Sequence, residues 1–386
     1  MIQVLYCKQS TTPIDAMIKT MKLGWEIKKL GEVCEILDHL RVPITKKDRR
    51  EGVYPYYGAS GIQDYVDSYI FDGRYLLVGE DGAKWGANDK SAYIIEGKSW
   101  VNNHAHILKL NDIISDRLVE YYLVSKDLQE YITGAVVPKL TQQALRNIPI
   151  PIPPSEEQER IVAELDCLSG IIEKKREQLK ELDALAQSIF YQMFGDPITN
   201  EKDWEVKKLG EVCKFSQGVQ VDLPLQSTEK KSGWNRFLRI VDYTTCNTDI
   251  RYVNISNDKY FVNFDDVVVV RYGASAGFVG IEKEGILANN LFKLNHDRNK
   301  LNYKYLYYLL STDYYKDFVK DIAFGAAMPA LSFNSFKNFN IYIPPIALQQ
   351  EFAEKIEAIE KQKELIKQSI TETEDLFNSR MDYYFN

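Results

Sequence analysis

Two stretches of the chain carry the apolar spacing of a long, narrowly packed helix. In the first, residues 155 to about 194, apolar residues recur in steps of three and four between Ile161 and Met193, and charged residues fill most other positions. This is the heptad pattern of a coiled coil, with Lys175 as its one charged member. Some 38 helical residues would extend over roughly 57 Å at ~1.5 Å per residue, so we expect this helix to act as a spacer.

The second stretch repeats this stripe later in the chain at one constant offset. Its apolar positions are Phe352, Ile356, Ile359, Ile366, Ile370 and Phe377. The proline pairs at 153–154 and 344–345 precede the two stretches with the same offset, and proline favours the first turn of a helix. Two near-equal halves in one chain close most simply about a twofold axis, so we predict that the helices pack antiparallel.

A β-rich module precedes each helical stretch. The modules open with nearly identical segments, WEIKKLGEVC at Trp25 and WEVKKLGEVC at Trp204. Short β-branched and aromatic runs follow, broken by Gly, Asp and Pro as is typical of strands and turns. The two copies share few residues in these runs, so we expect similar architecture with different surfaces.

These patterns predict an α+β fold in which two β-rich domains are joined by two long antiparallel coiled-coil helices in a pseudo-twofold repeat. The expected segments are an N-terminal extension (1–24), a first module (25–153), a central spacer helix (154–194), a second module (195–345) and a C-terminal spacer helix (346–386). Asn386 is equivalent to Gly195 in this repeat, which places the C-terminus close to the N-terminal segment.

Composition adds little about partners. The net charge is −7, but the two helical stretches are acidic and the modules are nearly neutral, so charge neither supports nor excludes DNA binding. No apolar run reaches the ~18 residues of a membrane span, and the first residues do not follow the layout of a signal peptide. We therefore expect a cytoplasmic protein with no membrane contact. The five cysteines include no CxxC pair, which argues against disulfides or a zinc cluster.

Catalytic motifs are not found in the sequence. The glycine-rich segment YGASAGFVG at Tyr272 fits neither dinucleotide nor P-loop spacing. The proline pairs lack the preceding Asn or Asp of an amino-methyltransferase loop. His104 and His106 alternate on an expected strand and could hold a metal only with further ligands from elsewhere. We expect for them a structural or DNA-facing role, and no catalytic residue or bound metal in the chain.

Basic residues interleaved with aromatics and amides are the candidate chemistry. Arg and Lys pair with guanine acceptors, Asn pairs with adenine, and all three bind phosphate. The candidates in the first module are Lys46, Lys47, Arg49, Arg50, Tyr56, Tyr57, Arg74, Lys84, Trp85, Asn102, Asn103 and Lys139, and those in the second are Lys230, Lys231, Trp234, Arg236, Arg239, Arg271, Tyr272, Asn289 and Asn290. For any single residue the alternative is an ordinary solvated side chain. As a set they favour recognition of DNA.

Five segments together resemble the DNA-specificity subunits of type I restriction-modification systems. They are PYYGASGI, FDGRYLLVGEDGA, WVNNHA, VPKLTQQALRNIPIPIPP and SEEQERIVAELD. The resemblance covers nearly the whole chain from Trp25 onward. It implies two target-recognition domains, each reading half of a split DNA sequence, and two helices that separate them and dock two methyltransferase subunits. The second copy has Ala330 in place of Lys139 and Ala347-Leu348 in place of Glu156-Glu157.

The resemblance further implies a non-catalytic subunit that reads an asymmetric bipartite target in double-stranded DNA and positions the methyltransferase subunits for adenine methylation. No cofactor is expected on this chain. S-adenosylmethionine belongs to the methyltransferase subunits, and ATP and Mg to the restriction/translocase subunits. Helix length is expected to set the gap between the half-sites. The alternative from another class is a coiled-coil scaffold whose β-rich modules bind other proteins.

Overall fold

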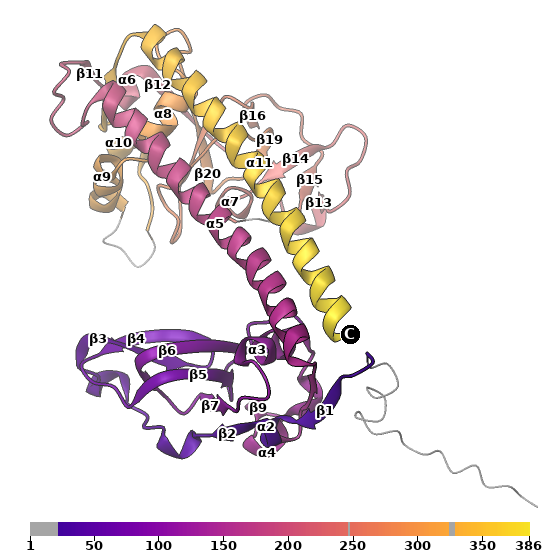
Figure 1. Cartoon of the computed structure of the whole chain (residues 1–386). Helices are drawn as coiled ribbons and strands as arrows, with labels where there is room; N and C mark the ends of the chain where they lie inside the picture. Colours follow the sequence, from indigo (N-terminus) through magenta and orange to yellow (C-terminus); the bar gives the residue numbers. More distant parts are fainter. Residues whose placement is uncertain (1–21, 246–247, 324–328) are drawn as a thin grey trace, which may run out of the picture. The chain divides into compact units, whose positions relative to one another are not determined.

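The computed structural model describes residues 22–245, 248–323 and 329–386. Its contacts divide into two compact units. The first unit holds the residues up to 175 together with 368–386, and the second unit holds residues 176–367. Both boundaries fall inside the two long helices drawn in Figure 1, α5 (Ser155–Phe194) and α11 (Ile346–Phe385). The extension expected at 1–24 lies, except for its last three residues, outside the described residues.

The predicted apolar stripe is the packed face of both helices. Ile161 and Phe352 are fully buried, and no residue of either predicted stripe is exposed. Lys175, the charged member of the stripe, donates hydrogen bonds from Nζ to the hydroxyls of Ser369 and Thr373 at 2.6 and 3.1 Å. A charged position inside a helix seam is tolerated here because the facing helix supplies hydroxyl acceptors.

In the first unit, the contacts between α5 and α11 advance along α5 as they move back along α11. The Glu164 carboxylate accepts a hydrogen bond of 3.0 Å from Arg380. Lys175, which comes later in α5, meets Ser369, which comes earlier in α11. The two helix segments of this unit are therefore antiparallel.

The second unit shows the same direction of packing. Asp183 of α5 pairs with Lys363 of α11. Phe190, further along α5, packs against Phe352 near the start of α11, with ring centres 5.7 Å apart. The antiparallel pairing predicted from the repeat is confirmed in both units.

The β-rich part of the first unit is one six-stranded sheet. In spatial order its strands are β2 (Cys34–Ile36), β7 (Ala105–Leu110), β5 (Phe71–Gly79), β6 (Ala92–Val101), β3 (Glu51–Gly58) and β4 (Gly61–Val66). Only the β3–β6 pair is parallel. Helix α3 (Asp116–Ser125) packs on β5 and β6. Short elements complete the unit: α2 (Leu30–Val33), η1 (Asp38–Leu40), η2 (Lys46–Asp48), η3 (Gln129–Tyr131), the hairpin β8 (Ile132–Thr133) and β9 (Lys139–Leu140), and α4 (Gln142–Arg146).

The second unit builds the same strand neighbours into two sheets. One has the order β12 (Cys213–Gln217), β20 (Leu291–His296), β17 (Val267–Val270) and β18 (Val279–Gly280), and the other has β13 (Gln226–Ser227), β15 (Arg251–Val253), β14 (Asn235–Leu238), β19 (Gly285–Leu287) and β16 (Phe261–Val262). Strands β16 and β17 pair with β19 and β20 as the single strand β5 pairs with β6 and β7. A turn in which the Asp266 N–H donates to the Asn263 carbonyl separates β16 from β17, and this break splits the sheet. The described helices of the module are α6 (Leu209–Val212), η4 (Leu223–Leu225), α7 (Ile240–Thr244), α8 (Tyr303–Leu309), α9 (Asp313–Ala323) and α10 (Phe333–Phe336).

The near-identical openings tie each module to α5. Strand β1 (Glu26–Lys29) pairs with β10 (Pro149–Ile152), and β11 (Glu205–Lys208) pairs with β21 (Asn340–Ile343). The Trp25 Nε1–H donates to the Glu157 carboxylate at the start of α5, and the Trp204 Nε1–H donates to the Phe194 carbonyl at its end, both at 2.8 Å. The two tryptophans therefore fix the module openings to the two ends of α5.

The end of α11 lies beside the first described residues. Lys22 donates a hydrogen bond of 2.8 Å to the Tyr383 carbonyl, and its ammonium lies 4.0 Å from the centre of the Tyr383 ring. The expected proximity of the C-terminus to the N-terminal segment is thus confirmed at Lys22.

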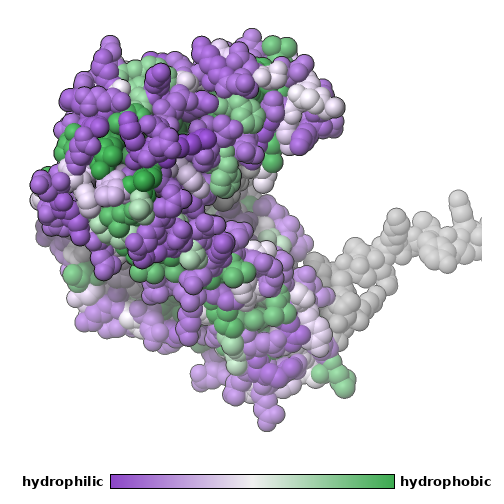
Figure 2. All heavy atoms as spheres, turned by 90° about the horizontal axis from the view of Figure 1, so that it is seen from above, coloured by the Kyte–Doolittle hydropathy of each residue, from purple (hydrophilic) through white to green (hydrophobic). Residues whose placement is uncertain are grey.

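Hydrophilic residues cover most of the face shown in Figure 2. Over the part of the chain that the structure describes, no helix combines the length and apolar character that a membrane span needs.

Candidate nucleic-acid interface

Four turns of the first module meet at one end of its sheet, and we call this end the rim. The turns lie at residues 58–61, 79–91, 102–105 and 134–140. A Cβ on Gly79 would lie 3.0 Å from the Ala59 carbonyl, so the first two turns are in contact. The N–H of Asn102 donates to the Tyr57 carbonyl at 3.0 Å, which joins the third turn to the end of β3.

Glu80 joins the remaining turns through its backbone. Its N–H donates to the His104 carbonyl and its carbonyl accepts from the N–H of Leu140, each at 2.8 Å. The segments PYYGASGI, VGEDGA, WVNNHA and VPKL, which are far apart in the sequence, therefore converge at the rim.

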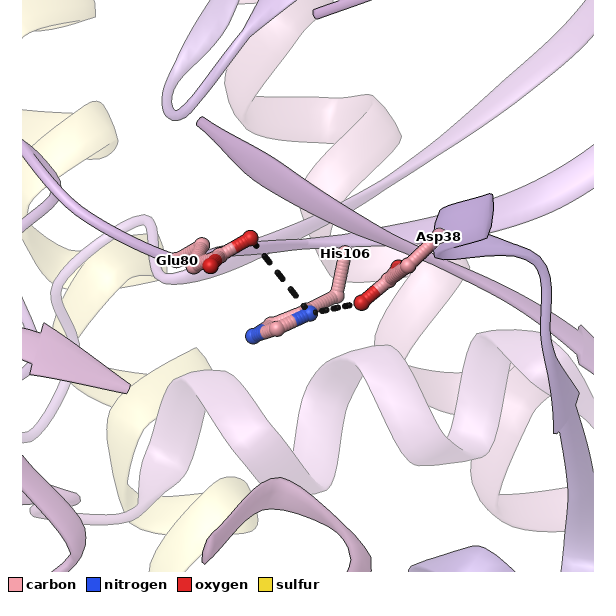
Figure 3. A group of neighbouring side chains, drawn as sticks. All are labelled: Asp38, Glu80 and His106. Carbon is pink, nitrogen blue, oxygen red and sulfur yellow. Dashed lines mark hydrogen bonds and ion pairs between the residues drawn. The ribbon is translucent and has the colours of Figure 1, made fainter. Parts of the chain in front are cut away.

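A buried cluster of charged side chains supports the rim (Figure 3). His106 of β7 is fully buried, with Nδ1 2.6 Å from Asp38 Oδ2 and Nε2 2.8 Å from the Leu140 carbonyl. Glu80 lies on the other side of Nδ1, at 3.8 Å. Both ring nitrogens therefore have an oxygen partner, a carboxylate on one side and a backbone carbonyl on the other.

Two further cations complete the cluster. Lys139 Nζ lies 2.6 Å from Glu80 Oε1, and Arg41 pairs with Glu80 and, at 3.4 Å, with Asp38. Burial acts to raise the pKa of both carboxyls, but these cations and His106 outweigh it and hold the pKa of Asp38 and of Glu80 below the ordinary value. The cluster is therefore an ion-pair network with both carboxylates charged.

The cluster also brings together atoms that could bind a metal. The ligating atoms of Asp38, Glu80 and His106 lie within 4.8 Å of one another. However, Arg41 and Lys139 already occupy the carboxylates, and both histidine nitrogens already have oxygen partners. A metal ion would have to displace two cations and the hydrogen-bond partners of the histidine. These residues fit a structural network that holds β9 in place better than a metal centre.

The matching end of the second unit uses the same backbone plan with different side chains. The Arg271 N–H donates to the Asn290 carbonyl at 2.8 Å, and its carbonyl accepts from the N–H of Leu331 at 2.9 Å, as Glu80 does in the first unit. The Arg271 guanidinium binds the Gln217 side chain and, at 3.3 Å, the Leu331 carbonyl. A cation thus stands where the first module has an anion.

Two further replacements extend this contrast. Phe292 pairs with β17 in the register in which His106 pairs with β5, so a buried phenyl ring replaces the hydrogen-bonded imidazole. Ala330 forms with Tyr272 the isolated bridge that Lys139 forms in the first unit. Ion pairs therefore stabilise the rim of the first module, whereas aromatic packing and one arginine stabilise the matching end of the second unit.

Comparison with known proteins identifies the family of the chain. The family model for the type I restriction modification DNA specificity domain matches residues 22–183 and again residues 201–375. The chain belongs to this family. It is a DNA-specificity subunit, the non-catalytic component of a type I restriction-modification system.

Relatives of this specificity subunit match it over most of its length. A putative type I restriction enzyme specificity subunit of Haemophilus influenzae is 26% identical over 388 residues, which is 98% of each chain. The MjaVIII specificity subunit of Methanocaldococcus jannaschii is 20% identical and covers 87% of this chain and 86% of its own length. The solved S subunit from M. genitalium superposes with a TM-score of 0.62 at 14% identity, over 95% of this chain and 98% of that chain. The predicted fold class is confirmed.

Three of the predicted DNA contacts of the specificity subunit are core residues. Tyr56 is 1% exposed. Trp85 is buried and donates from Nε1 to a backbone carbonyl at 3.0 Å. Asn102 is buried and bonds the Gln63 side chain and the N–H of His104. We correct the prediction at Tyr56, Trp85 and Asn102, because side chains that fill the core or shape a turn from within cannot reach DNA.

A second group of predicted residues is held by acceptors of its own module. The pairs are Arg49 with Asp64, Arg74 with Asp116, Lys139 with Glu80, Arg236 and Arg239 with Asp242, and Arg271 with Gln217. These partners fix where the cations lie. Arg74 is in the middle of β5 and contacts the start of α3, so the structure does not bring it to the rim.

The remaining predicted residues keep accessible side chains. Lys46, Lys47, Arg50, Lys84, Asn103, Lys230 and Lys231 are exposed, and Tyr57, Trp234, Tyr272, Asn289 and Asn290 are half-buried. Of the exposed residues, Lys84 and Asn103 belong to the rim. Contact of this third group with DNA stays a prediction.

The residues that hold the rim together carry no motif that predicts their role. Asp38 and Arg41 belong to a segment without a motif, and Glu80 lies among carboxylates whose spacing does not fit a metal nuclease. The one available signal was the alternation of His104 and His106 on a predicted strand. That pattern places one polar side chain in the core, where it needs charged or polar partners.

Proposed function

We propose that this specificity subunit reads an asymmetric, bipartite target in double-stranded DNA, one half with each β-rich module. The modules proposed are residues 25–153 and 195–345, with spacer helices at 154–194 and 346–386 and an extension at 1–24. The observation that carries the proposal is the contrast at matching ends of the two modules. In the first module, this end holds the ion-pair network around Glu80 and His106. In the second module, Arg271 and Phe292 occupy the equivalent positions.

This contrast supports two independent readers. Backbone hydrogen bonds at Glu80 and Arg271 are the same, so the two modules present their turns in the same way. The side chains on those turns differ in charge and shape, and base edges in DNA are distinguished by such differences. The same scaffold with different side chains therefore favours two different half-sites.

We infer the partners from the family. Two methyltransferase subunits bind the specificity subunit, and each flips an adenine of one half-site for methylation. They hold S-adenosylmethionine, while restriction/translocase subunits that join the complex hold ATP and Mg. A solved chain from a study of complex assembly and conformational transition of the type I system matches 95% of this chain with a TM-score of 0.53 and 17% identity. That match supports a subunit that acts within an assembly.

DNA binding by the purified complex tests the proposal. Anisotropy of labelled duplexes should show one sequence bound more tightly than a scrambled duplex of equal length. The logarithm of the affinity should fall linearly with the logarithm of the salt concentration, because phosphate contacts release counterions. A complex that assembles but binds all sequences alike would overturn the proposal and favour the protein-binding scaffold.

A further inference from the structure

The hairpin β8–β9 of the first module ends in two exposed valines. The side chains of Val136 and Val137 are in the tip between the strands and are 93% and 61% exposed. The tip belongs to the rim, because Lys139 of β9 forms a bridge with Asp81. Adjacent branched apolar side chains at the tip of a loop are typical of a contact surface.

The structure holds this tip in one shape. Gly134 has φ +94°, and a Cβ there would lie 2.4 Å from the Val137 carbonyl, so the turn requires glycine. On the other side of the tip, Pro138 restricts the backbone φ angle. Strand β9 is then held by the Lys139–Glu80 ion pair and by the hydrogen bond from His106 to the next residue. The buried network thus has a clear use, since it fixes the strand that presents the valines.

The side chains around the tip suit a polyanion. The accessible groups are Lys139, Lys84, Asn103 and His104, of which the Lys139 and His104 side chains are 43% and 46% exposed. The two carboxylate residues that contact Lys139 of β9 are largely covered. The Glu80 side chain is 8% exposed and paired with Lys139, and Asp81 is 20% exposed and paired with His104. Hydrogen-bond donors therefore face outward around an apolar tip. This arrangement suits a DNA groove, where the donors would contact the phosphates and the tip would face the base edges.

We propose that the β8–β9 hairpin enters the major groove of the first half-site and packs Val136 and Val137 against thymine methyl groups. This inference rests on the proposed function and deepens it. The major groove admits a two-stranded ribbon, and apolar side chains there contact the thymine methyl. The second module carries GAAMP in the place of GAVVP, at residues that lie mostly outside those described, so its preference should differ.

Deoxyuridine, which lacks the methyl group, provides the test. The full chain is assembled with its methyltransferase subunits and bound to its own target duplex, as defined by methylome sequencing. Every thymine of the first half-site, except the one opposite the methylated adenine, is replaced by deoxyuridine. Wild-type affinity should fall about tenfold, in keeping with the loss of a few apolar contacts. The variant Val136→Ala/Val137→Ala should bind the thymine duplex about tenfold more weakly and lose nothing further on deoxyuridine.

A matched control and the contrary outcomes complete the test. Val53→Ala removes an equally exposed valine, 78% exposed on β3, and should behave as wild type. A sequence-selective wild-type complex that ignores the deoxyuridine replacement overturns the hairpin assignment alone. A first half-site without further A·T pairs also overturns that assignment. So does a double variant that fails to assemble with methyltransferase in size-exclusion chromatography, because that result would assign the valines to a protein contact. A wild-type complex without any sequence preference overturns the proposed function itself.

Discussion

The corresponding ends of the two modules share a backbone arrangement and differ in how it is stabilised. In the first module, charged side chains around Glu80 and His106 are buried against strand β9. In the second, the same backbone hydrogen bonds surround Arg271, and Phe292 takes the place of the histidine. A buried ion-pair network depends on every member, because losing one leaves a buried charge without a partner. In aromatic packing, substitution of one ring leaves no buried charge without a partner. The two modules should therefore respond differently to substitution.

Removal of His106 should have the largest effect. In the variant His106→Ala, Asp38 loses the imidazole partner of its Oδ2, and the Leu140 carbonyl loses its hydrogen bond from Nε2, while the Ile107 N–H and Arg41 still face Asp38. Breaking a buried pair costs about 3–5 kcal/mol. The free energy of opening of the first unit, measured by hydrogen exchange at β5 and β7, should fall by that amount. His104→Ala, which removes an exposed pair with Asp81, should cost less than about 1 kcal/mol, and equal losses would contradict the network.

Acid should weaken the first unit through the same carboxylates. The folded pKa values of Asp38 and Glu80 are lowered, so their contribution is present above the unfolded values, about 4, and is lost as pH falls through the folded values. The variant Asp38→Asn/Glu80→Gln should therefore be less stable than wild type at pH 6. The difference should shrink between pH 4 and pH 2 in urea titrations followed by tryptophan fluorescence. A difference that stays constant with pH would show that the carboxylates act by packing alone.

Substitution of Arg271 should affect recognition by the second module only. Its guanidinium is positioned by Gln217 and by the Leu331 carbonyl, and loss of a positioned base contact costs about 1–3 kcal/mol. Arg271→Ala should weaken binding to the cognate duplex about tenfold and relax sequence preference in one half-site. The control Arg298→Ala removes a surface cation of the same module, 55% exposed. Relaxed preference in both half-sites would contradict independent modules.

Lys84 should give the smallest effect. It is exposed on the rim and offers a single point charge rather than a two-pronged donor. We therefore expect Lys84→Ala to weaken binding a few-fold on all sequences and to reduce the salt slope by about 1, as loss of a phosphate contact does. Lys180→Ala, on the exposed face of α5 with a side chain 76% exposed, should leave the slope unchanged. A change in sequence preference with Lys84→Ala would instead assign this lysine to a base.

The repeat in the sequence was enough to predict the architecture, because heptad spacing and paired prolines depend on local chemistry. The candidate site was less accessible to prediction. Tyr56, Trp85 and Asn102 have the composition of contact residues, yet tertiary packing buries them. Glu80 and Arg41 meet through a fold that joins distant segments, and no local pattern marks such a pair. Side-chain type indicated the chemistry, whereas burial decided which side chains are available.

Exchange of one module tests the central claim most directly. Residues 25–153 are replaced by those of another specificity subunit with a known target, and the methylome of a host carrying the complete system is sequenced. We predict that one half of the methylated sequence changes to the donor's half-site and that the other half is retained, because each module reads its own half. A change in both halves, or methylation of the original sequence, would contradict two independent readers in one chain.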